Sequence, residues 1–143
     1  MGTALLSFVI DNSMALAWTL PDEWSLEADR VLDRVINEGG HVPFHFPAEL
    51  ANGLTMAVRK GRIDEQARFA AYESFPKLNL VRDLEGVDRM KAAIELADFY
   101  RLTVYDALYL ELAKRLSLPL ATFDEALARA TQREGLALAV SLN

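Results

Sequence analysis

Four acidic residues stand at points of the sequence where a strand is expected to end or a helix to begin. They are Asp11 in Phe-Val-Ile-Asp-Asn-Ser, Glu49 in Pro-Ala-Glu-Leu-Ala-Asn, Asp106 in Thr-Val-Tyr-Asp-Ala-Leu, and Asp124 in Leu-Ala-Thr-Phe-Asp. Carboxylates that lie close together repel one another unless a cation holds them, and hard divalent metal ions prefer oxygen ligands. A fold that gathers these four residues would therefore create a metal-binding site.

The elements that would position these acids follow from the pattern of apolar residues. The apolar run at residues 5–10 is typical of a strand buried on both faces, and further strands are expected near 41–42 and over 78–81, 120–123 and 136–140. Helices are expected over residues 28–36, from Pro47 onward, and over 64–73, 87–97, 104–116 and 125–134. This alternation predicts an α/β fold with a parallel sheet covered by helices on both faces.

The same topology predicts that the four acids share one rim of the sheet. Helices that connect parallel strands begin at the carboxyl edge of the sheet, which is the edge where ligands bind. Asp11 and Asp124 end strands, whereas Glu49 and Asp106 lie in the first turns of helices. Helix amino termini offset only part of four negative charges, so a bound cation is expected there.

A structural alternative is that each of these acids only caps a helix, because Asp and Glu are common in first turns. Thr103 with Asp106 resembles a capping box, and Asp11 could cap a helix that begins near Ser13. Two details favour the metal site: Asp11 directly follows an apolar run, and Thr103 already supplies the cap that Asp106 would provide.

The composition limits the classes of function. The chain has 143 residues, a formal charge of −6, no cysteine and two histidines, His41 and His45. These values predict one soluble domain, residues 1–143, and support oxygen ligands rather than zinc or thiol chemistry. No apolar run suits a membrane span or a signal peptide, so a cytoplasmic protein with no membrane partner is expected. The negative charge argues mildly against binding nucleic acid, although cations held by the carboxylates would reverse the local field.

The four acidic segments, in this order, resemble the PIN-domain family and specifically the VapC-type toxins of type II toxin–antitoxin systems. The resemblance covers nearly the whole chain and rests on Val-Ile-Asp-Asn-Ser, Pro-Ala-Glu-Leu-Ala-Asn, Val-Tyr-Asp-Ala-Leu-Tyr-Leu-Glu-Leu-Ala and Leu-Ala-Thr-Phe-Asp. It implies a single-domain three-layer α/β/α sandwich with a parallel sheet of four or five strands. It also implies an endoribonuclease that depends on Mg²⁺ or Mn²⁺, with RNA as substrate and a cognate antitoxin as partner; a homodimer is expected.

The resemblance assigns the site by position. The catalytic and metal-binding quartet is Asp11, Glu49, Asp106 and Asp124. We expect the three aspartates to contact metal directly or through water, while Glu49 orients the attacking water or acts as the base. Ser13 and Thr122 match hydroxyl residues of the family and are secondary candidates, although Ser13 could simply cap a helix and Thr122 could simply belong to its strand.

Two other classes of function stay open. One is an aspartyl-phosphate phosphatase or receiver-type domain with Asp11 as the nucleophile. Such phosphatases need a second aspartate where Ser13 stands, and receivers need a lysine after a late strand, whereas Lys114 lies late in a helix. The other is a catalytically silent PIN-like module that binds a protein. The presence of all four acids favours the enzyme.

Aromatic and methionine side chains pose a further choice between core and contact surface. An apolar groove for a partner protein could be lined by Trp18, Trp24, Met14 and Met56, or these could fill the core or a homodimer interface. The aromatic group Phe99, Tyr100, Tyr105 and Tyr109 falls at helical spacings and is expected mostly in the core, although one tyrosine near Asp106 could stack on an RNA base.

Overall fold

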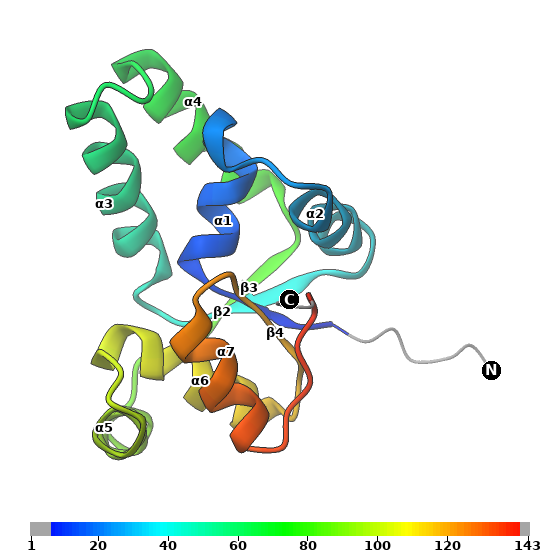
Figure 1. Ribbon diagram of the computed structural model, residues 1–143, viewed down its shortest axis with the longest axis vertical. Helices are drawn as coiled ribbons and strands as arrows, with labels where there is room; N and C mark the ends of the chain where they lie inside the picture. The colour runs from blue at the N-terminus through cyan, green and yellow to red at the C-terminus, as the bar shows by residue number, and fades with distance from the viewer. Residues whose placement is uncertain (1–6, 141–143) are drawn as a thin grey trace.

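A four-stranded parallel sheet forms the centre of the computed structural model, which describes residues 7–140. The strands are β1 (Val9–Ile10), β2 (Gly40–Val42), β3 (Leu80–Arg82) and β4 (Leu120–Ala121). Their order is β3-β2-β1-β4 and every neighbouring pair is parallel (Figure 1). In the register, Val9 of β1 faces His41 of β2 and Leu120 of β4. The predicted parallel sheet is confirmed.

Helices cover the sheet on two sides. They are α1 (Asn12–Thr19), α2 (Leu26–Glu38), α3 (Phe46–Arg59), α4 (Glu65–Ser74), α5 (Val87–Tyr100), α6 (Val104–Leu116) and α7 (Glu125–Arg133), with short 3₁₀ helices η1 (Pro21–Glu23) and η2 (Phe75–Lys77). Figure 1 shows α1 to α4 above the sheet and α5 to α7 below it. The three-layer α/β/α arrangement expected from the sequence is therefore confirmed.

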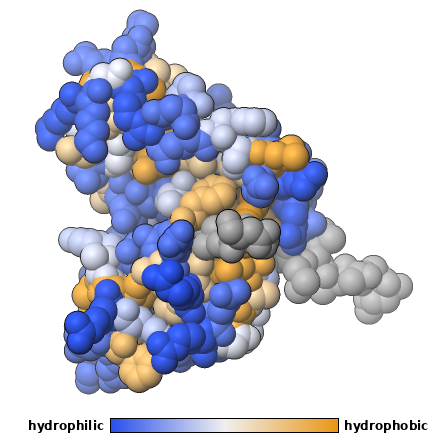
Figure 2. All heavy atoms as spheres, in the orientation of Figure 1, coloured by the Kyte–Doolittle hydropathy of each residue, from blue (hydrophilic) through white to orange (hydrophobic). Residues whose placement is uncertain are grey.

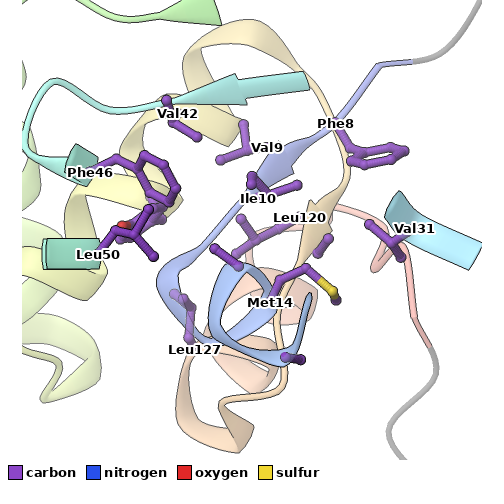
Figure 3. Close-up of a cluster of buried hydrophobic side chains, with 14 of the residues drawn as sticks. Phe8, Val9, Ile10, Met14, Val31, Val42, Phe46, Leu50, Leu120 and Leu127 are labelled. Carbon is purple, nitrogen blue, oxygen red and sulfur yellow. The ribbon is translucent and has the colours of Figure 1, made fainter. Parts of the chain in front are cut away.

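The core is built around β1, because that strand lies inside the sheet and is covered on both faces. Phe8, Val9 and Ile10 are fully buried, as an apolar run in a parallel strand predicts. Figure 3 shows these side chains packed with Leu120 from β4, Met14 from α1 and other apolar residues of the flanking helices. This packing fixes the end of β1, which is where Asp11 follows.

Three expected strands are shorter than the sequence suggested; the one predicted over residues 120–123 is observed as β4 at Leu120–Ala121. The strand predicted over residues 136–140 is wrong: in the described part of the chain it is a single parallel bridge between Leu120 and Leu138. Its backbone hydrogen bonds to β4 involve only Leu120, which donates to Ala137 and accepts from Ala139, so no ladder extends beyond that residue. The first strand is assigned only to Val9–Ile10; residues 5 and 6 of the predicted run lie outside the described residues.

The predicted helices are observed, with ends shifted by a few residues at most positions. α6 has the predicted bounds, and α2 ends where Gly39 adopts a positive φ of 84°. Between α3 and α4, Gly61 (φ 72°) makes the turn that follows the basic end of α3. Across residues 7–140 the structure has no helix that combines the length and the apolar character needed to cross a membrane.

The side chains considered for a partner groove divide between core and surface. Met14 is fully buried, and Trp18 packs against the core while its indole N–H donates to the Ala28 carbonyl (2.9 Å). Trp24 and Met56 are 61% and 37% exposed, so only these two are free to contact another molecule. Figure 2 shows a mostly hydrophilic surface in this view, with separate apolar patches.

Candidate functional site

Asp11 lies between β1 and α1, where it caps the helix and is almost completely buried. Its Oδ1 accepts hydrogen bonds from the Met14 backbone N–H (3.0 Å) and the Ser13 hydroxyl (2.7 Å). Its Oδ2 accepts one from the Thr122 hydroxyl (2.5 Å). Burial raises the pKa of Asp11 to about 7, even though these hydrogen bonds favour the charged form. Asp11 is therefore a helix cap and also a carboxyl group that ionises near neutral pH.

The hydroxyl groups of Ser13 and Thr122 join the ends of β1 and β4. Besides donating to Asp11, Ser13 accepts from the backbone N–H of Phe123 (2.9 Å), and Thr122 accepts from that of Asp124 (2.9 Å). Thr122 is fully buried. The structure thus places both hydroxyl residues against Asp11 and makes Thr122 a direct link from Asp11 to the Asp124 backbone.

Asp124 and Asp106 begin helices at the same rim. The Asp124 carboxylate caps α7 by accepting from the Leu127 N–H (2.8 Å). In α6 the cap is Thr103, whose hydroxyl accepts from the Asp106 N–H (3.1 Å). The pKa of Asp106 is raised, first by burial and then by the negative charges of Asp124 and Glu49. The capping alternative therefore holds for Asp11 and Asp124, while in α6 that role belongs to Thr103.

Glu49 reaches the same group of acids from the first turn of α3. Its Oε1 accepts a hydrogen bond from the hydroxyl of Tyr109 (2.6 Å), a fully buried residue of α6. The pKa of Tyr109 is raised well above its usual value, first by burial and then by Glu49, so the phenol stays protonated and donates. Sequence reasoning missed this contact, because it joins residues 60 positions apart and depends on how α3 and α6 meet.

His45 fills the space beside Glu49. Its Nε2 lies 3.4 Å from Glu49 Oε1, and its side chain is 9% exposed. Neither ring nitrogen has a partner in hydrogen-bonding geometry, so the 3.4 Å approach is a contact rather than a hydrogen bond. The imidazole packs instead against three rings, those of Phe44, Tyr105 and Tyr109. A role for His45 could not be assigned from the sequence, because two of the rings around it come from α6, far away along the chain.

The four carboxyl groups thus form one electrostatic unit. Asp106 interacts with Asp124 and Glu49, and Asp11 interacts with Asp106. We call Asp11, Glu49, Asp106 and Asp124 the acidic quartet. The fold brings them to the carboxyl edge of the sheet, as the topology predicted.

A family model described as the PIN domain matches residues 8–132. The chain belongs to the PIN-domain family. All four residues of the acidic quartet lie inside the matched region, so the family assignment covers the rim as well as the sheet.

Curated relatives of this PIN-domain chain are named as VapC proteins, the class that the sequence resembles. The chain is 38% identical over 98 residues to Ribonuclease VapC3 of Mycobacterium tuberculosis, which covers 68% of this chain and 69% of that protein. A protein of the same name from Pyrobaculum aerophilum is 28% identical over 124 residues, covering 86% and 93% of the two chains. The resemblance to VapC-type proteins is confirmed.

Solved structures show the same PIN fold. PAE2754 from Pyrobaculum aerophilum superposes with a TM-score of 0.68 at 22% identity, covering 92% of this chain and 84% of that one. Mycobacterium tuberculosis VapC20, described as a sarcin-ricin loop cleaving toxin, gives 0.63 at 17% identity, with coverage of 87% and 95%. FitAcB from Neisseria gonorrhoeae gives 0.63 at 16% identity, with coverage of 92% and 95%. At these identities the likeness concerns the fold.

The quartet of this PIN domain suits a hard divalent ion by the chemistry of its donors. All four side chains offer carboxylate oxygens, and Asp11 Oδ2 accepts only one hydrogen bond, which leaves it able to bind further. Within residues 7–140, no three acidic or histidine side chains are arranged to hold one ion directly. Mg²⁺ keeps several water ligands and commonly binds through one or two carboxylates, so the quartet fits an ion held partly through water.

Proposed function

We propose that this protein is a metal-dependent endoribonuclease that acts as the toxin of a toxin–antitoxin pair. The observation that supports this most is the convergence of the acidic quartet at one rim of a PIN domain, with the pKa of Asp11 raised to about 7. The name Ribonuclease VapC3 on a relative that is 38% identical supports RNA as the substrate. The toxin description of VapC20 supports the biological role by analogy of fold.

In this proposal Asp11, Asp106 and Asp124 hold one or two Mg²⁺ or Mn²⁺ ions, directly or through water. The bound metal would supply charge to offset that of the phosphate and would lower the pKa of water. The hydroxyls of Ser13 and Thr122 keep the Asp11 carboxylate in place from two sides. Their role is to orient Asp11, since each donates a hydrogen bond to that carboxylate.

Glu49 is proposed as the group that orients the attacking water or accepts its proton. Its Oε1 accepts the hydrogen bond from the Tyr109 phenol, which holds the carboxylate to α6, and we assign the contact with the attacking water to Oε2. A metal held by the quartet would offset the negative charge that hydrolysis places on the phosphate, which the acidic protein surface could not do. The net charge of −6 is compatible with RNA binding on these terms.

The decisive experiment compares the purified full chain, freed of any bound protein, with Asp106→Asn in Mn²⁺-dependent cleavage of a panel of structured RNAs. Asp88→Asn is the matched control, because Asp88 is an exposed acid in the first turn of α5, as Asp106 is in the first turn of α6. We expect cleavage by the wild type and by the control, and none by Asp106→Asn.

The same experiment separates the proposal from the alternative of a silent binding module. If no protein cut RNA but Mn²⁺ raised the melting temperature of the wild type and not of Asp106→Asn, the metal site would be supported and the RNA panel would need to change. An absence of both cleavage and metal response would overturn the nuclease proposal.

The proposed partners are a cognate antitoxin and a second copy of this chain. An antitoxin should abolish cleavage when it is purified with this protein at equal concentration. Sedimentation velocity of the isolated chain would test the expected homodimer. Cleavage that is unaffected by the protein encoded beside this chain would argue against the toxin role, while leaving the ribonuclease intact.

A further inference from the structure

We propose that Tyr105 is a stacking platform for one unpaired base of the RNA, next to the phosphate that the acidic quartet addresses. This inference rests on the proposed function and adds to it one residue that would contact a base of the substrate. Tyr105 lies in the first turn of α6, and its ring packs against His45, whose Nε2 is 3.4 Å from Glu49 Oε1 of the quartet.

The two tyrosines of α6 have opposite environments. Tyr109 is fully buried and its hydroxyl donates a hydrogen bond to Glu49, whereas Tyr105 is 60% exposed. A large aromatic side chain with that exposure gains little from the core, and it stands near the four carboxyl groups of the quartet. Tyr105 is therefore the tyrosine of α6 that is free to contact a ligand.

The Tyr105 ring is supported on its protein side. It lies against His45, with ring centroids 5.7 Å apart and planes tilted by 36°. His45 is held in turn by Tyr109 (5.1 Å, edge-on) and Phe44 (5.7 Å, edge-on). A ring that is already backed by packed neighbours loses less freedom when a base stacks on its open face, because less ordering is needed on binding.

The chemistry of the rim explains why such a platform is needed. A site of carboxylates and metal engages phosphate, which every nucleotide presents, and it makes no contact with bases. An exposed aromatic ring beside it supplies the face on which an unpaired base stacks. Bases inside a duplex already stack on one another, so the geometry favours a loop or a single strand.

The test uses short single-stranded RNAs of mixed sequence, each with 2-aminopurine at one position, mixed rapidly with protein and Mn²⁺. Stacking of 2-aminopurine on a ring quenches its fluorescence, and the first milliseconds report binding before cleavage. We compare the wild type with Tyr105→Leu, which removes the ring, and Tyr105→Phe, which keeps it. The matched control is Trp24→Leu, because Trp24 is 61% exposed but follows η1, beyond the far end of the helix that starts after Asp11.

We expect the wild type, Tyr105→Phe and Trp24→Leu to quench one position strongly and Tyr105→Leu to lose that quench. Where the RNA is cleaved, Tyr105→Leu should raise KM about tenfold, in line with the loss of one stacked base. The kcat and the Mn²⁺ concentration for half-maximal cleavage should stay unchanged. Equal thermal melting of the four proteins would show that the fold is intact.

If Tyr105→Leu showed the same quench and the same KM as the wild type, the stacking platform would be overturned and the ribonuclease proposal would stand. A loss of quench in Tyr105→Leu without cleavage by any protein would support the platform and count against the nuclease. If Tyr105→Leu instead changed the sedimenting mass of the protein, Tyr105 would belong to a protein interface and the inference would be wrong.

Discussion

Asp11 shows how one residue can serve the fold and the site at once. It caps α1 and accepts three hydrogen bonds, which favour the carboxylate, yet its burial favours the neutral acid more strongly. The result is a pKa of about 7 in the metal-free protein. A cation at the rim would reverse this balance, because it stabilises the charged form.

Metal-free stability should therefore depend on pH through Asp11. Its pKa rises from 3.8 to about 7 on folding, so the folded state holds a proton that the unfolded state has released between these values. The free energy of unfolding should fall as pH rises from 4 to 8, by up to about 4 kcal/mol from this group. Urea denaturation in EDTA measures it. Asp11→Asn should flatten the profile, whereas Asp64→Asn, which alters an exposed cap of α4, should not.

Tyr109 should affect both stability and the cleavage rate through a single hydrogen bond. Tyr109→Phe keeps the buried ring but removes the donor to Glu49 Oε1, and it should cost about 1 kcal/mol of stability. Because Glu49 is then no longer held, the cleavage rate should fall about tenfold with little change in KM. Single-turnover kinetics would show this, with Tyr72→Phe as the exposed control. An unchanged rate would mean that Glu49 is positioned by other contacts.

At the scale of elements, α6 contributes most to the site. It carries Asp106, Tyr109 and Tyr105 within its first two turns and packs extensively on α5. Its bounds could be predicted from the sequence because Thr103 caps its start and Ser117-Leu118-Pro119 follows its end. The strands were predicted less well, since their ends depend on which neighbours remain to pair with, and this is not a local property.

The cap of α6 gives a prediction at this scale. Thr103→Ala removes the acceptor for the Asp106 N–H and should lower the free energy of unfolding by about 1 kcal/mol. The first turn would also hold Asp106 less firmly, so the Mn²⁺ concentration that gives half-maximal cleavage should rise. Thr103→Ser keeps the acceptor and should restore both values. Wild-type behaviour of the alanine variant in urea denaturation would show that α6 needs no cap.

At the scale of the whole molecule, the quartet joins parts of the chain that are far apart in sequence. It draws on the end of β1 and on the first turns of α3 and α6 and the cap of α7. A ligand that binds only the folded state stabilises all of these together, by about 2.7 kcal/mol at one hundred times its Kd. Mn²⁺ should therefore raise the melting temperature in one cooperative transition, and EDTA should reverse the effect. A transition that split in two would contradict this coupling.

The sequence predicted the common rim of the four acids because strand ends and helix starts follow from local patterns and from the rule for parallel sheets. It did not predict the contacts that complete the rim. Glu49 meets Tyr109 across 60 positions and Asp11 meets Thr122 across 111, and such pairs depend on how whole helices and strands pack. Thr122 was a candidate because it matches a hydroxyl residue of the family. Its hydrogen bond to Asp11 places it at the centre of the rim.

The pairing of β1 with β4 has a consequence for synthesis of the chain. β1 is made early, but its neighbour β4 and the hydroxyl of Thr122 are made 111 positions after Asp11. Closing so large a loop is slow, and a growing chain cannot close it before the later segment has left the ribosome. The nascent polypeptide therefore lacks Asp124 and the β4 side of the rim while the 111 positions after Asp11 are being made. The four acids of the quartet can therefore come together only after β4 and Asp124 have left the ribosome.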